Sequence, residues 1–215
     1  GFHLEAEDGN GGDAFDAQGA VGQVLPVEGG QAHHFREAQG DDGQEHAVEF
    51  EGPRNITSEV LGEYWLSFIT GYWNEYGIAR RNMEKGIMPP ICGDLQNPWK
   101  HSNGAWIRTE VWATLAPAYP DLAVRFAIED AKVDHGFGEG TYSAAFIAAL
   151  ESAAFVVSDL RKLIEIGLAK IPADCRTAKT VKLAIDCYDD GKSWLEARNA
   201  IQKENADIGD GWFQA

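Results

Sequence analysis

The stretch TSEVLGEYWLSFI, residues 57–69, carries its apolar side chains at the spacing of an α-helix. Thr57 or Ser58 can cap the start of such a helix, and Glu59 falls in its first turn. From Val60 onward the apolar residues recur so that they share one broad face. The stretch therefore predicts an amphipathic helix with one face in a hydrophobic core.

Similar patterns continue along the rest of the chain, and no strand-like alternation is convincing after residue 53. We therefore predict an all-α domain of antiparallel neighbours. A long irregular connection with a short helix near 78–85 follows the first helix. The predicted helices span residues 57–70, 104–115, 120–134, 141–157, 159–170, 175–189 and 193–203. The side chains expected to be buried are Trp65, Phe68, Trp112, Phe126, Phe146, Leu150, Phe155 and Ile164.

The composition excludes several classes of protein. A net charge of −16 and a pI of about 4.6 argue against binding to duplex nucleic acid or to an anionic membrane surface. No apolar run reaches the roughly 18 residues of a membrane helix, and the first residues do not resemble a signal peptide. The three cysteines form no C-x-x-C pair, so we expect buried free thiols and a cytoplasmic protein.

Residues 1–53 differ in character from residues 54–215. They hold twelve acidic residues, eleven glycines and a single basic residue, Arg36. Such a segment has too few large apolar groups to offset the entropy lost on ordering. Two stretches within it, residues 20–27 and 46–52, could instead form short strands. We predict an irregular or disordered acidic segment followed by a helical domain from residue 54.

The sequence HGFGEGTY, residues 135–142, places three alternating glycines before a helix rich in alanine. The first amides of a helix lack intrahelical partners and can bind an anion, which glycine allows to approach closely. His135 can contact the same anion or a sugar hydroxyl. The alternative is an ordinary glycine-rich turn, because a bare G-x-G-x-G pattern is weakly specific.

A second junction lies at SNGAWIR, residues 102–108, where Ser102 and Asn103 can cap a helix. Arg108 can pair with a phosphate in bidentate fashion. An ion pair with Glu110 or another acidic residue is the more usual role for such an arginine.

Together these motifs are similar to the ADP-ribosylglycohydrolase family. The resemblance rests on SNGAWIR, on the turn APAYPDLA, on the helix ending AIEDAKVDH and on GFGEGTY, all in the family's order, and it spans residues 54–212. It implies an all-α orthogonal helical bundle. It also implies hydrolysis of the bond between ADP-ribose and an acceptor, with two Mg²⁺ ions to orient water and the ribose hydroxyls. ADP-ribose or an ADP-ribosylated substrate is the implied partner.

The resemblance also implies roles for particular residues. One segment contacts the diphosphate and ribose, and another closes over ADP-ribose with its glycines making the turn. The implied residues are Ser102, Asn103, Gly104 and Arg108 in the first segment, and His135, Gly136, Gly138, Gly140 and Tyr142 in the second.

The metal ligands are where the chain departs from the family. Asp41 and Asp42 stand where an Asp-Asp-Thr motif is expected, but Gly43 replaces the threonine, and no carboxylate cluster of the family's C-terminal type precedes Ala215. The domain therefore looks incomplete at its C-terminus. Three functions stay open: a hydrolase whose metal site is completed by other acids or a partner chain, a non-catalytic ADP-ribose or nucleotide-binding module, and a structural protein.

Overall fold

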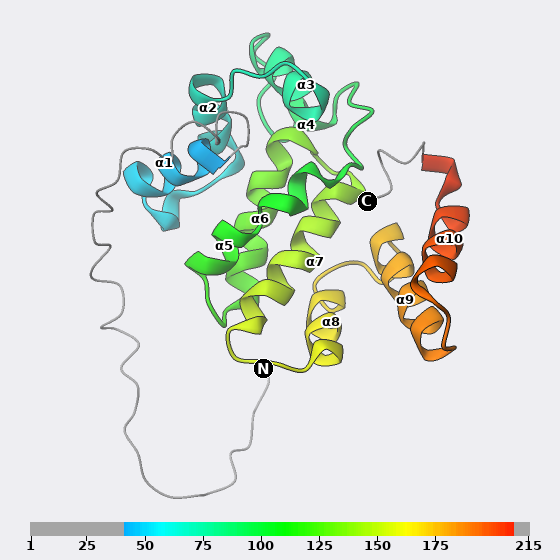
Figure 1. Ribbon diagram of the computed structural model, residues 1–215. Helices are drawn as coiled ribbons and strands as arrows, with labels where there is room; N and C mark the ends of the chain where they lie inside the picture. The colour runs from blue at the N-terminus through cyan, green and yellow to red at the C-terminus, as the bar shows by residue number, and fades with distance from the viewer. Residues whose placement is uncertain (1–40, 209–215) are drawn as a thin grey trace, which may run out of the picture. The chain divides into compact units, whose positions relative to one another are not determined.

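The computed structural model describes residues 41–208 of the chain (Figure 1). Helices make up this region, and no strand occurs within it. None of its helices is long and apolar enough to cross a membrane. The α-helices are α1 Asp41–Glu51, α2 Ser58–Phe68, α3 Asn74–Met83, α4 Ile91–Asp94, α5 Glu110–Leu115, α6 Pro120–Asp134, α7 Glu139–Ala154, α8 Leu160–Leu168, α9 Arg176–Asp189 and α10 Trp194–Glu204, and the 3-10 helices are η1 Pro53–Asn55, η2 Asn103–Arg108 and η3 Ala206–Ile208.

The predicted helices are confirmed with ends that differ by a few residues, except that the helix predicted over 104–115 is divided into the 3-10 helix η2 and the short helix α5. Local sequence explains several starts. The Thr57 hydroxyl accepts from the amide of Val60 at α2, and Pro120 opens α6. Ser193 and Glu196 form the capping box predicted for α10. The short helix predicted near 78–85 is α3, which begins earlier, and the connection that follows it also contains α4; α3 and α4 pack on each other and on α6.

Helices α6 and α7 pack along each other and contact most of the other elements (Figure 1). Close approach is possible because α7 buries small side chains, among them Ala144, Ala145 and Ala148. Trp65, Trp112 and Phe126 are large fully or almost fully buried side chains of the main core. A second cluster, which includes Phe146 and Ala178, joins α7 to α9.

The prediction of an irregular segment is wrong for residues 41–51, which form α1, and so is the alternative of a strand at 46–52. Helix α1 packs on α2 and buries Ala47 and Gln44 completely. This tertiary contact stabilises a stretch whose own composition is polar. Residues 1–40 lie outside the described part of the chain.

Several predictions of burial are also tested. Phe68 is 42% exposed and Phe155 is 59% exposed, because each stands at the end of its helix. Leu150 and Ile164 are partly buried. The other expected core residues are confirmed, and all three cysteines are buried free thiols.

Candidate functional site

The two junctions singled out in the sequence meet in the structure. Ser102, which precedes η2, has its Oγ 3.1 Å from Nε2 of His135, the residue that ends α6. The amide of Gly140 donates to the carbonyl of Lys100 at 3.3 Å. Two segments more than thirty residues apart thus form one continuous piece of structure at the start of α7.

The glycines of the 135–142 loop are needed for this contact. A Cβ on Gly138 would lie 2.1 Å from the carbonyl oxygen of Lys100, and one on Gly140 would lie 2.3 Å from the ring of His135. Gly136 has a φ of +55° and faces the backbone of Asp94. The glycines therefore let the loop pack against the segment before η2.

The amides at the start of α7 do not stay free, which corrects the expectation from the sequence. Glu139 N donates to Nδ1 of His101, and Gly140 N to Lys100 O. The amides of Gly138 and Thr141 donate to carbonyls within the loop. The loop is thus a packed turn whose amides bind protein groups, and an anion would have to compete for them.

Arg108 likewise takes the alternative role given above, an ion pair, although its partner is not Glu110. Its Nε donates to Asp130 Oδ2 at 2.8 Å, while Nη1 and Nη2 reach the two oxygens of Asp134 at 3.0 and 2.8 Å. The side chain is buried, and its guanidinium also donates to the carbonyl of Gly104. Arg108 therefore holds the interior together and is not available for a ligand phosphate.

The rings of Trp65 and Tyr76 lie beside this guanidinium, with centroids 5.5 and 5.9 Å from its central carbon. The two rings stack on each other with centroids 5.0 Å apart, and they keep water away from the ion pairs, which strengthens these pairs. Because water is excluded, removing the arginine or an aspartate of these pairs destabilises the fold more than it would at the surface.

The network continues from Asp130 to α1. Gln44 Nε2 donates to Asp130 Oδ2 at 2.5 Å, and Trp112 Nε1 donates to the same oxygen at 3.1 Å. Gln44 lies one helical turn after Asp41. The start of α1 is thereby tied to the interior that supports the two junctions.

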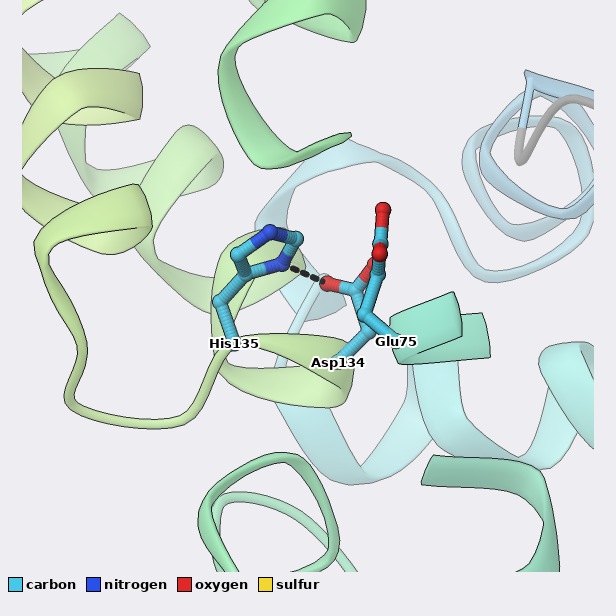
Figure 2. Close-up of side chains that lie close together, drawn as sticks. All are labelled: Glu75, Asp134 and His135. Carbon is cyan, nitrogen blue, oxygen red and sulfur yellow. Dashed lines mark hydrogen bonds and ion pairs between the residues drawn. The ribbon is translucent and has the colours of Figure 1, made fainter. Parts of the chain in front are cut away.

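Glu75, Asp134 and His135 form a buried group beside this network (Figure 2). The Nδ1 atom of His135 lies 2.7 Å from Asp134 Oδ1. Burial would raise the pKa of Asp134, but Arg108 and His135 lower it to about 2. Burial and the charge of Asp134 raise the pKa of Glu75. Asp134 is therefore an anion whose charge is balanced in place, whereas the pKa of Glu75 lies above the usual value of a glutamate.

Atoms of Glu75, Asp134 and His135 lie within 4.8 Å of one another, so the group is a possible metal-binding cluster. It does not fit the Mg²⁺ that the family resemblance implies. Both Asp134 oxygens already accept from Arg108, and a guanidinium at that position repels a second cation. Mg²⁺ also prefers oxygen ligands and retains several waters, whereas this group is fully enclosed and includes an imidazole.

The remaining predicted residues take different positions. Asn103 lines a cavity of about 210 Å³ next to the junction. Gly104 packs against Glu75, since a Cβ there would lie 2.0 Å from Oε1. Tyr142 packs against the second hydrophobic cluster. The side chains of Asp41 and Asp42 lie outside the described residues.

Sequence reasoning missed the roles of Asp130, Asp134 and Glu75. Asp130 and Asp134 are four residues apart on α6 and so share one face, which indicates a common partner for both. Nothing in the sequence around Glu75 pointed to its place beside His135.

Comparison with known proteins adds one finding. A family model described as ADP-ribosylglycohydrolase matches residues 32–215. No curated protein and no solved structure matches the chain significantly.

Proposed function

Because the chain belongs to the ADP-ribosylglycohydrolase family, we propose that it hydrolyses the glycosidic bond between ADP-ribose and an acceptor when its metal site is complete. The reaction breaks the bond from the ribose carbon to the acceptor and adds a water oxygen to that carbon. One proton of the water ends on the leaving acceptor, so no oxidant or reductant is needed. Charge develops on the ribose carbon in the transition state.

The observation that carries the proposal is the meeting of the Ser102 turn with the 135–142 loop, joined by Ser102 Oγ and His135 Nε2. We assign the diphosphate and ribose to the turn made by Ser102, Asn103 and Gly104, of which Asn103 is the partly exposed residue. The 135–142 loop forms the other wall. His135 is fully buried with both ring nitrogens engaged, so it acts by orienting Ser102. We do not assign Arg108 to the ligand.

Asp41 and Asp42 remain the proposed metal ligands. Support comes from α1, whose Gln44 bonds to the interior beneath the two junctions. Mg²⁺ bound there would supply a Lewis acid that orients water and ribose oxygens. Its full ligand set requires carboxylates beyond those that the described residues bring together.

A second candidate function is ADP-ribose binding without hydrolysis. Hydrolysis would need Mg²⁺, and the possible metal-binding group found among residues 41–208, Glu75, Asp134 and His135, does not fit this ion. This observation favours binding without hydrolysis. A protein of this kind would keep the two junctions and lack turnover.

The test incubates the full 215-residue chain with ADP-ribosylated arginine and serine peptides and follows free ADP-ribose by chromatography. Release that needs Mg²⁺ and is lost in Asp42→Asn supports the hydrolase. ADP-ribose binding without release supports the second candidate. If neither release nor binding occurs in folded protein, both are wrong.

A further inference from the structure

Four aromatic side chains form a stack across the contact between α1 and α2 (Figure 1). The ring centroids of Tyr64 and Phe68 lie 5.9 Å apart, and those of His46 and Phe68 lie 4.5 Å apart. The Phe50 ring follows at 6.1 Å from that of His46. Each helix contributes two residues that are four positions apart and so share one face. We call these four side chains the aromatic stack.

The aromatic stack faces water instead of the core. Phe50 is 70% exposed and Phe68 is 42% exposed, while the other two rings are partly exposed. The residues that these helices turn toward the core, among them Ala47, Leu61 and Trp65, are fully buried. Single exposed apolar residues are common, but neighbouring rings that are exposed together indicate an interaction surface.

The charge around the aromatic stack is almost entirely negative. Residues 41–68 contain seven acidic residues and one basic residue, Arg54. Partial burial and the charges of Glu51 and Glu63 raise the pKa of Tyr64, so both carboxylates lie close to its ring. Glu51 also accepts a hydrogen bond from the Tyr64 hydroxyl at 3.3 Å. Neither glutamate forms an ion pair within the described part of the chain, so both can pair with a cation from outside.

This charge distinguishes between the possible occupants of the surface. A second copy of the chain would place the same acidic residues opposite these, and residues 1–40 hold seven acidic residues and a single arginine. Nucleic acid and anionic membranes are repelled for the same reason. A cationic side chain is attracted both by the carboxylates and by the faces of the rings. Arginine suits the surface better than lysine, because its planar guanidinium can stack on a ring while it pairs with a carboxylate.

We propose that the aromatic stack binds an arginine-rich segment of a partner protein. Its guanidinium groups lie over the exposed rings of Phe50 and Phe68 and pair with the carboxylates of Glu51 and Glu63. Each exposed contact of this kind changes affinity only by roughly two- to fivefold, so the segment must carry several arginines. The proposal rests on the surface of α1 and α2 and does not depend on the proposed hydrolysis.

Fluorescence anisotropy with the full chain tests the proposal, and the probe is a labelled peptide of alternating arginine and glycine. This peptide should bind more tightly than its lysine counterpart, and added salt should weaken the binding. Phe50→Ala combined with Phe68→Ala should weaken it by roughly fivefold or more, because both exposed rings are lost. Glu63→Gln should weaken it and reduce its salt dependence, because one carboxylate is lost.

Matched changes elsewhere on the surface serve as controls. Phe155→Ala at the end of α7 removes another exposed ring, and Glu165→Gln on α8 removes another exposed carboxylate. Both variants should bind the arginine peptide as the unmodified chain does. Thermal unfolding checks that each variant is folded. If the double variant does not fold, Phe50→Ala alone changes the most exposed ring of the stack and should weaken binding by roughly twofold.

The proposal is wrong if the arginine peptide does not bind, or if the lysine peptide binds equally well. It is also wrong if the folded phenylalanine variants bind as tightly as the unmodified chain, since the attraction would then come from net charge alone. Sedimentation that shows a dimer in the unmodified chain and a monomer in these variants would assign the surface to a second copy, which would refute the proposal as well.

Discussion

The charged side chains around Arg108 are buried, whereas most of those of the helix pair α9–α10 are exposed. Arg108, Asp130 and Asp134 are almost fully buried and pair with one another at 2.8 to 3.0 Å, while Oδ1 of Asp130 has no hydrogen-bond partner among the described residues. In contrast, α10 buries no residue at all, and exposed pairs such as Arg161 with Asp189 hold the surface of α8 and α9. In the buried region each charged group needs its protein partner, because water cannot reach it. In the exposed region water can hydrate a charged group that loses its partner.

This difference indicates where the fold tolerates change. A buried ion pair adds little net stability over apolar packing, but losing one partner leaves an uncompensated charge in the interior. Exposed pairs contribute little and are screened by salt. The buried network is also the part that supports the two junctions, so damage to it should reach the candidate site.

The largest expected effect is that of Arg108→Met. The change leaves Asp130 and Asp134 buried without their cation and should lower the free energy of unfolding by about 3–5 kcal/mol. Urea denaturation measures it. The matched change in the exposed region, Arg161→Met, should cost less than about 1 kcal/mol. Equal losses in the two variants would remove the distinction between the regions.

A smaller effect is expected from pH at Glu151. Burial raises the pKa of Glu151 from 4.5 to about 7, against the hydrogen bond from Thr109. Folding therefore takes up a proton between these pH values, and the free energy of unfolding should fall as pH rises from 4.5 to 7.

Glu151→Gln should remove this part of the pH dependence and raise the melting temperature at pH 8 relative to the unmodified chain. The exposed Glu165→Gln on α8 is the control and should leave the pH dependence in place. If the melting temperatures of Glu151→Gln and the unmodified chain change with pH in the same way from pH 5 to 8, Glu151 does not titrate as described.

The smallest effect is expected in the exposed helix α10. Ser193→Ala removes the cap of α10 and should cost about 1 kcal/mol. Hydrogen exchange at α10 should then speed up while the amides of α6 keep their protection. Ser67→Ala, an exposed serine within α2, is the control. Faster exchange throughout α6 would mean that the two regions unfold together.

The sequence predicted the helices well because their apolar periodicity is local information. It failed at α1, where Ala47 and Gln44 are ordered by contacts with residues far along the chain. Exposed Phe68 shows the same limit, since periodicity does not say where a core ends.

For the candidate site, the sequence predicted that the glycines let an anion approach the helix amides, with an ordinary glycine-rich turn as the alternative. The glycines of the folded loop instead face protein groups. Gly138 faces the carbonyl of Lys100, and this partner is set by tertiary packing. The sequence around Arg108 was compatible both with binding a phosphate and with forming an ion pair. The i, i+4 spacing of Asp130 and Asp134 becomes decisive only once α6 is known to face η2.

Titration of ADP-ribose into the unmodified chain and into Gly138→Val tests most directly the claim that the two junctions form one ADP-ribose site. The account predicts binding in the range of roughly micromolar to millimolar for the unmodified chain. It predicts loss of binding in a folded Gly138→Val variant, because the new side chain would separate the loop from Lys100. Cys187→Ser on α9 should bind as the unmodified chain does. Undiminished binding in Gly138→Val would contradict the assignment of the site.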